Sequence, residues 1–251
     1  IIGVGIKYIA IKKLSNFWIC SALVYFSYFF LLHEMTQIRT SIASGVLLLC
    51  IPFIYHKNLK GFLILVFLGT MAHYSLIAII PMYYLNIKKV EKIFFFLIPI
   101  AYLMFFLNIN ISSILGLVNS LYDGGGTRFE YYLILAKSSS IRVLTTLQLL
   151  HIIICYILLW KWKFLSKKND YFIILLKFYV IATSLYAALA DIPALAIRFS
   201  ELFHIVEIIL IPMLIYLTKK KIDAKMLIII LSLFCLLLVT FRLELIKPYF
   251  N

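Results

Sequence analysis

The sequence predicts an all-α protein that crosses a membrane several times. Hydrophobic residues make up 65% of the 251 residues and charged residues only 14%, whereas a soluble domain has about 45–50% apolar and about 25% charged residues. The mean hydropathy of +1.07 agrees with this. The composition excludes a soluble enzyme, a disordered chain and a fibrous repeat, and it favours a polytopic α-helical integral membrane protein.

The membrane spans are predicted from the apolar runs. A span needs about 20 apolar residues, and by this measure the chain has about eight spans besides the stretch 61–87. The runs cover residues 1–11 (the end of a truncated helix), 15–33, 38–55, 61–87, 93–110, 141–160, 171–190, 200–217 and 226–241. No repeat or linker divides residues 1–251, so we expect a single membrane domain. Because the sequence starts at Ile1 without Met, we also expect a fragment that lacks an N-terminal span.

Lysine and arginine occur in different loops. Fifteen lysines and no arginine lie in loops that the positive-inside rule places in the cytoplasm: Lys12, Lys13, Lys57, Lys60, Lys88, Lys89, Lys92, Lys161, Lys163, Lys167, Lys168, Lys219, Lys220, Lys221 and Lys225. All five arginines lie on the other side or at its helix ends: Arg39, Arg128, Arg142, Arg198 and Arg242. The net charge of +14 is therefore attributed to the orientation of the chain in the membrane. We expect no nucleic-acid partner.

The placement of arginine indicates an anionic substrate. A guanidinium group stays charged and offers a planar fork of donors that matches phosphate or carboxylate. Several such groups on one face suggest an outward cavity for a diphosphate or another polyanion. The four cysteines lie in apolar runs without a CxxC pair, and no HExxH motif is present. We therefore expect neither a metal site nor a cofactor.

Residues 61–87 are predicted to form a hairpin. Lys60 and Lys88 are both assigned to the cytoplasm, so the stretch between them must return to its starting side. It is too short for two full spans, which need about 40 residues. We expect a short or re-entrant hairpin, or two tilted half-length helices, with His73 at the midpoint near a cavity open to the outer face. The alternative is one kinked helix with Lys88 outside.

Three polar constellations are candidates for substrate binding. In the first, Glu34, Gln37 and Arg39 place an acid, an amide and a cation in the turn between two spans, unless Glu34 serves as a structural partner of Arg39. The second is the loop 111–140, which we expect to be extracytoplasmic. It contains three glycines followed by Arg128, which is either a substrate ligand or a loop ion pair.

The third constellation is a ridge of ionisable residues after Asp191. Arg198, Glu201, His204 and Glu207 recur every three residues, so adjacent members are neighbours on a helix. The ridge runs from the outer surface into the membrane, where ionisable groups are functional candidates by default. A structural polar network between helices is the competing interpretation.

These motifs resemble a known family. Gln37-Ile38-Arg39 with Ile42-Ala43, then His73-x-Ser75-Leu76 with Pro81, and the late Arg198-Phe199 with Glu201 are similar to the EpsG-type family of exopolysaccharide and O-antigen polymerases, which are Wzy-like proteins. The resemblance covers about residues 1–217. It implies a multi-pass, GT-C-like glycosyltransferase of the bacterial inner membrane that joins oligosaccharide units carried on undecaprenyl diphosphate at the periplasmic face.

The chemistry implied by the resemblance suggests a role for each candidate. The substrate-binding candidates are Arg39, Arg198, Arg128, Gln37, Glu34 and Asp191, and the general-base candidates are His73, His204 and Glu201. The lipid bilayer and the lipid-linked oligosaccharide are the expected partners, with a chain-length regulator protein as a further candidate. The alternatives are an O-antigen ligase-like transferase, a transporter or flippase of lipid-linked oligosaccharide, and, with less support, a membrane-bound acyltransferase.

Overall fold

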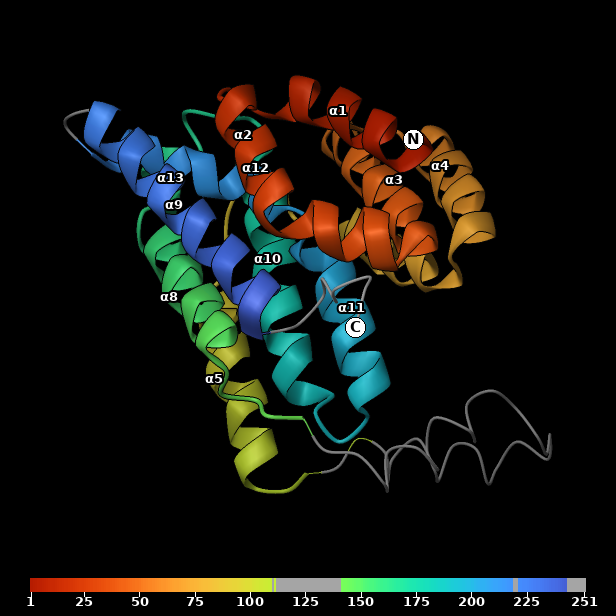
Figure 1. The fold of residues 1–251 in the computed structure, drawn as a ribbon. Helices are drawn as coiled ribbons and strands as arrows, with labels where there is room; N and C mark the ends of the chain where they lie inside the picture. Colours follow the sequence, from red (N-terminus) through yellow and green to blue (C-terminus); the bar gives the residue numbers. More distant parts are fainter. Residues whose placement is uncertain (110, 112–140, 219–220, 243–251) are drawn as a thin grey trace, which may run out of the picture. The chain divides into compact units, whose positions relative to one another are not determined.

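The computed structural model describes residues 1–109, 111, 141–218 and 221–242. Every regular element in these ranges is a helix, which agrees with the predicted fold class (Figure 1). In chain order the elements are α1 (Ile2–Leu14), α2 (Trp18–Val24), η1 (Tyr25–Thr36), α3 (Ile38–Tyr55), α4 (Leu59–Ala72), η2 (Tyr74–Tyr84), α5 (Ile93–Phe106), α8 (Thr146–Trp160), α9 (Trp162–Leu165), α10 (Phe172–Ala188), α11 (Pro193–His204), α12 (Glu207–Leu210), η3 (Ile211–Leu217), α13 (Lys221–Leu237) and η4 (Leu238–Arg242).

The chain divides into two compact units. Unit 1 comprises Ile1–Val90, Ile157–Leu176 and Ile205–Asn251, and unit 2 comprises Glu91–Tyr156 and Lys177–His204. Whether they act as the single membrane domain expected from the sequence stays a prediction.

Three helical stretches in the described residues are long and apolar enough to cross a membrane. They are Trp18–Thr36, Ile38–Tyr55 and Pro193–Leu217, and several shorter apolar helices of 10–17 residues accompany them. Their positions agree with the predicted runs, although the last stretch begins seven residues before the predicted residue 200. The total of about eight spans stays a prediction.

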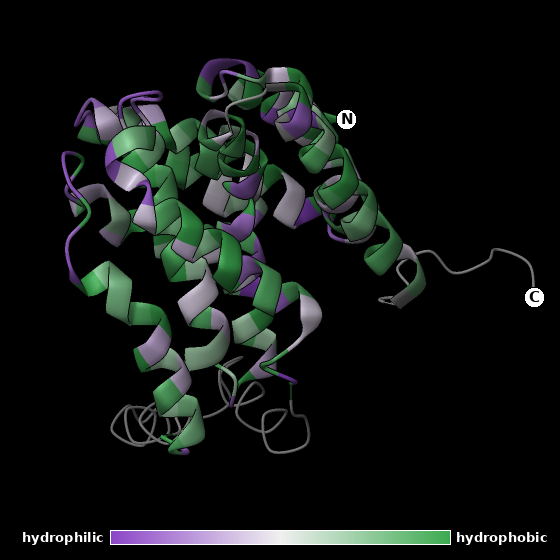
Figure 2. Ribbon diagram, turned by 90° about the vertical axis from the view of Figure 1, so that its left-hand side faces the viewer, coloured by the Kyte–Doolittle hydropathy of each residue, from purple (hydrophilic) through white to green (hydrophobic). Residues whose placement is uncertain are grey.

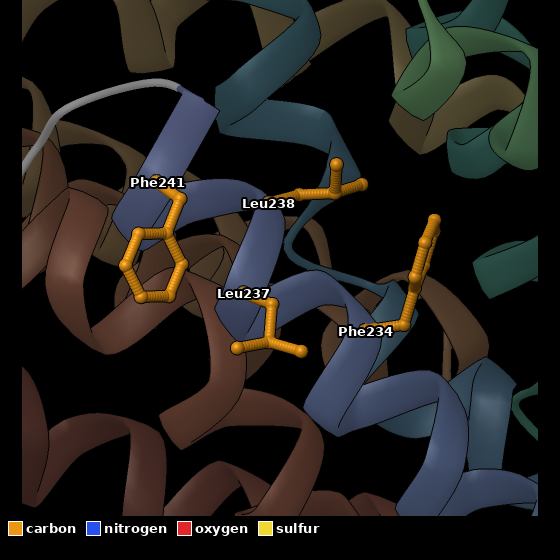
Figure 3. Close-up of a pocket in the computed structure, with 4 residues that line it drawn as sticks. All are labelled: Phe234, Leu237, Leu238 and Phe241. Carbon is orange, nitrogen blue, oxygen red and sulfur yellow. The ribbon is translucent and has the colours of Figure 1, made fainter.

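Hydrophobic residues predominate along the described helices, as the hydropathy colouring of the ribbon shows (Figure 2). On α4, for example, Phe67 and Met71 are exposed. At the end of α13 and in η4, a hollow is lined by Phe234, Leu237, Leu238 and Phe241 (Figure 3). All four side chains are hydrocarbon, so this surface suits lipid acyl chains better than a polar substrate.

In unit 1, helices α1, α3 and α4 pack in a defined register. A Cβ at Gly3 would lie 1.9 Å from Ser41 Oγ, and one at Gly45 would lie 2.8 Å from Ile6 Cγ2. Residue numbers rise together along this contact, so α1 and α3 run in parallel. Helix α4 runs the opposite way against α3, because Gly61 lies opposite Phe53 and Gly69 opposite Val46.

The predicted hairpin at His73 is present. The helix α4 ends at His73, whose extended backbone (φ −151°, ψ 109°) starts the return through η2. At the open end, Lys57 Nζ donates hydrogen bonds to the carbonyl oxygens of Tyr83 (2.9 Å) and Leu85 (3.1 Å). The Phe62 and Tyr83 rings also meet there, 5.2 Å apart. These contacts contradict the alternative of one kinked helix.

Both arms of the hairpin are short. Helix α4 has 14 residues and η2 has 11, so each is about 21–22 Å long. The hydrocarbon core of a bilayer is about 30 Å thick. Each arm is therefore too short for a full crossing, as the sequence predicts, and the depth of the hairpin in a membrane stays a prediction.

Several lysine-rich loops of unit 1 gather at one end of its helices. Asn16 Nδ2 donates to Lys168 O (2.7 Å), and Asn169 Nδ2 donates to Leu14 O (2.7 Å). The ring of Tyr216 lies 5.0 Å from that of Phe17, so the end of η3 joins the same group. Arg39 lies at the opposite end of the 18-residue helix α3. Within unit 1, the described lysine loops and Arg39 therefore lie on opposite sides.

In unit 2, Glu91 and the Arg142 segment likewise lie toward opposite ends of α5. Near the start of α5, the Lys177 ammonium group forms an ion pair with Glu91 Oε2 at 2.5 Å. Toward the other end of α5, Ala101 packs with Val143, Ala187 and Ala190. The Arg142 segment and the turn between α10 and α11 thus lie together, away from Glu91.

Candidate substrate site

A buried polar cluster joins three helical elements of unit 1. Lys7 of α1 donates hydrogen bonds to Glu34 Oε1 (2.7 Å) and Ser41 Oγ (3.0 Å). The hydroxyl groups of Tyr25 (2.8 Å) and Ser41 (2.5 Å) donate to the same Glu34 oxygen. We call these four residues the Lys7 cluster. The Lys7 side chain is fully buried, and that of Glu34 is 10% exposed.

The backbone around Glu34 explains how the cluster forms. The sequence predicts Glu34 in a turn, but the helix continues as the wide π-helix η1 to Thr36. The chain changes direction at Gln37 (φ −131°, ψ 61°), and Gln37 O then accepts a hydrogen bond from Ser41 N. Glu34 therefore lies on a helix, with its carboxylate against the first turn of α3.

One carboxylate oxygen of Glu34 has capacity for a further hydrogen bond. Oε1 accepts three hydrogen bonds, whereas no described residue donates to Oε2. A Cβ at Gly3 would lie only 3.0 Å from Oε2, so the absence of a side chain at Gly3 leaves that space open. If Glu34 binds substrate, Oε2 is the oxygen that accepts its hydroxyl group.

A second buried contact lies beside the cluster. The Ser44 hydroxyl is 3.2 Å from His33 Nδ1, and it also donates to Ser41 O. Both side chains are buried, and His33 Nε2 has no hydrogen-bond partner among the described residues. The contact joins η1 to α3 about one helical turn after Ser41.

Arg39 differs from Glu34 in its surroundings. It is exposed on the first turn of α3. The ion pairs between described residues are Lys7–Glu34 and Lys177–Glu91, and Arg39 takes part in neither. The alternative that Glu34 is the structural partner of Arg39 is therefore wrong. The guanidinium group of Arg39 is available to an external anion.

His73 lies at the tip of the hairpin, near the depth of the Lys7 cluster. In the antiparallel register of α3 and α4, Gly61 lies opposite Phe53 and Gly69 opposite Val46. The same register, extended by one turn of α4, places His73 level with the start of α3. His73 is partly exposed, and its ring centre lies 5.4 Å from that of Tyr74.

The remaining described candidates lie in unit 2. Arg198, Glu201 and His204 are on one helix, α11, as the three-residue spacing predicts. The exposure of these side chains falls along the helix, from exposed Arg198 to buried His204. Asp191 is partly buried just before Pro193, which begins α11. Glu207 belongs to a separate short helix, α12, so the predicted ridge is interrupted after His204.

His204 is part of a buried aromatic and hydroxyl cluster. Its ring centre lies 4.2 Å from that of His151 and 5.5 Å from that of Tyr179. Its Nε2 atom is 3.3 Å from Thr183 Oγ1. Because His204 is only 3% exposed, a substrate hydroxyl would reach it only after a local opening. The role of His204 as a base stays a prediction.

The candidates chosen from the sequence include Arg128 but not Lys7. Arg128 and the rest of the loop 112–140 lie outside the described residues, so their predicted role stays a prediction. Lys7 was missed, although it is a lone cation inside the apolar run at 1–11. An ionisable residue in such a run is itself a signal for a functional or paired site.

The comparisons with known proteins gave one result. The family model described as the EpsG family matches residues 1–251, the whole chain. Neither the curated proteins nor the solved structures gave a match.

Proposed function

Because the chain belongs to the EpsG family, which supports a polymerase-type role in polysaccharide synthesis, we propose that it joins oligosaccharide repeat units carried on undecaprenyl diphosphate. The transfer takes place on the side of the bacterial inner membrane where the arginines lie, in a GT-C-like arrangement of about eight spans. The observation on which this proposal depends is the exposed Arg39, five residues after a Glu34 that is already paired with Lys7.

In the proposed reaction, a hydroxyl group of one lipid-linked unit attacks the anomeric carbon of the growing chain. The bond between that carbon and the diphosphate oxygen breaks, and undecaprenyl diphosphate leaves with both bonding electrons. A base takes the hydroxyl proton. Arg39 binds the leaving diphosphate, since a fixed cation stabilises the negative charge that develops there. Arg198 and Arg128 are further proposed ligands for negative charge on the substrate.

We propose His73 as the base. A base must come within hydrogen-bond reach of the hydroxyl group, and the hairpin register supports a position level with the start of α3. His73 is partly exposed, in contrast to His204. Glu201 and His204 remain candidates for the same step. Gln37, Glu34 (through Oε2) and Asp191 are proposed to contact sugar hydroxyl groups.

The test is complementation of a strain that lacks its own polymerase, with the polysaccharide separated by size. The wild-type gene should restore long chains. Arg39→Ala and Arg39→Lys should leave single repeat units on the acceptor lipid, because Lys lacks the planar fork of Arg. Arg142→Ala, a second exposed arginine with no proposed role, should keep the long chains. All variants should be compared at equal amounts in the membrane.

The results also separate the proposed function from its alternatives. A full ladder from Arg39→Ala would refute the site. Long chains that reach lipid A only when another polymerase is present would identify an O-antigen ligase-like transferase. Movement of labelled lipid-linked units across the membrane without polymer formation would identify a flippase or transporter.

A further inference from the structure

Lys7 occupies an unusual place for a lysine. The side chain is fully buried, and its ammonium group contacts Glu34 Oε1 and Ser41 Oγ, with the Tyr25 ring centre 5.4 Å away. Removing both charges of such a pair from water costs several kcal/mol per ion, and hydrophobic replacements of similar size are often as stable or more so. Stability alone is therefore a weak reason for a lysine at this position.

The close packing of α1 against α3 fixes the position of Lys7. A Cβ at Gly3 would overlap Ser41 Oγ, and one at Gly45 would approach Ile6 Cγ2 to 2.8 Å and Lys7 Cγ to 3.4 Å. Glycine at these two positions lets the helices approach closely. The ammonium group of Lys7 is thereby held at the level of the first turn of α3, where the Glu34 carboxylate also lies.

The consequence for Arg39 is electrostatic. Glu34 and Arg39 are five residues apart on either side of the bend at Gln37, and Ser41, which donates to Glu34, shares the first turn of α3 with Arg39. With Lys7 present, the local set of Lys7, Glu34 and Arg39 has one net positive charge. Without Lys7, the set is neutral, and the Glu34 carboxylate becomes an acid partner for Arg39.

We propose that Lys7 is a positioning residue for the anion site: it holds the Glu34 carboxylate in a buried ion pair and so keeps Arg39 available for the diphosphate of the substrate. The inference rests on the proposed function, because it assumes that Arg39 binds a diphosphate. Lys7 itself touches no substrate and acts through Glu34.

The test measures binding of undecaprenyl diphosphate to the full-length protein in lipid nanodiscs, with uncharged undecaprenol as the ligand control. Lys7→Met should raise the Kd for undecaprenyl diphosphate about tenfold, which corresponds to about 1.4 kcal/mol. The double variant Lys7→Met/Glu34→Gln should return the Kd to within about threefold of wild type, because the competing carboxylate is gone. Binding of undecaprenol should not change.

A second comparison tests whether the effect passes through Arg39. Arg39→Gln should raise the Kd on its own, and Lys7→Met should add nothing further in that background. Lys7→Gln retains a hydrogen-bond donor and serves as the alternative variant if Lys7→Met does not fold. Lys177→Met is the matched control, because Lys177 is another fully buried lysine with a glutamate partner, and its Kd should stay at the wild-type value.

The possible results distinguish a failure of the Lys7 inference from a failure of the proposed function. An unchanged Kd in folded Lys7→Met and Lys7→Gln would overturn the inference while leaving the proposed function intact, provided that Arg39→Gln weakens binding. A Kd that remains raised in the double variant would show that Lys7 does not act through the Glu34 carboxylate, and this too would overturn the inference. An unchanged Kd in Arg39→Gln would remove the diphosphate site itself, and with it the basis of both proposals.

Discussion

Removing either charge of the Lys7–Glu34 pair should destabilise the protein, but Glu34→Gln and Lys7→Met should do so to different extents. Glu34→Gln leaves the ammonium group of Lys7, which is fully buried, without a countercharge. Lys7→Met leaves the Glu34 carboxylate with two hydroxyl donors, from Tyr25 and Ser41, and with 10% exposure. The first substitution should therefore destabilise the protein more than the second.

The expected losses of stability follow from the interaction partners that the remaining charged group loses in each variant. Breaking a buried pair by removing one partner costs about 3–5 kcal/mol, so we expect about 3 kcal/mol or more for Glu34→Gln. Two of the three hydrogen bonds to Glu34 Oε1 survive in Lys7→Met, which should cost about 1–2 kcal/mol. The double variant has no uncompensated charge, and its cost should fall below the sum of the two by about 2 kcal/mol.

The assay is thermal unfolding in nanodiscs, followed by tryptophan fluorescence. For a chain of this length, 1 kcal/mol corresponds to about 2–4 °C in Tm, so Glu34→Gln should lower the Tm by about 6–12 °C. The pair Lys177→Met and Glu91→Gln provides a comparison, because Glu91 is 32% exposed and water weakens its coupling. Strictly additive Tm shifts for Lys7 and Glu34 would refute the reasoning, since uncoupled residues are additive.

Three further predictions concern the hairpin and the base. Gly69→Ala should destabilise the protein by about 1–3 kcal/mol because its Cβ would meet Leu76 Cδ2 at 2.2 Å, whereas Gly5→Ala, inside α1 with open space around it, should be neutral or stabilise the protein by up to about 1 kcal/mol, because alanine favours a helix over glycine. Cysteines introduced at positions 58 and 86 should react with an impermeant thiol reagent from the same side of the membrane, and labelling from opposite sides would contradict the hairpin topology. His73→Gln should abolish polymer formation while binding of undecaprenyl diphosphate stays near the wild-type value, and normal polymer would exclude His73 as the base.

The helices could be predicted from the sequence because their signals are local. Apolar runs placed α3 at the same residues in the prediction and the structure, and the lysines at both ends of residues 61–87 required the hairpin. The predicted span starts at residue 200, seven residues after the start of α11 at Pro193, because Arg198 interrupts the apolar run. Pro193 was the available signal, since proline is favoured at the first position of a helix.

The Lys7 cluster could not be predicted because its contacts are distant in the sequence. Lys7 and Glu34 are 27 residues apart, and Lys7 and Ser41 are 34 apart. Composition and spacing within one helix contain no information about such a contact. As a result, the sequence left Arg39 as an alternative partner of Glu34, and only the packing of α1 on α3 identified Lys7 as the partner.

The proposed function of this protein is the synthesis of polysaccharide from lipid-linked repeat units. Its most direct test uses the purified protein in nanodiscs with repeat units on undecaprenyl diphosphate, isolated from a strain that lacks its polymerase. The wild-type protein should form chains of several units and release one undecaprenyl diphosphate for each new linkage, and Arg39→Ala should form neither product. Repeat units that stay single in the presence of folded wild-type protein would contradict the proposed function.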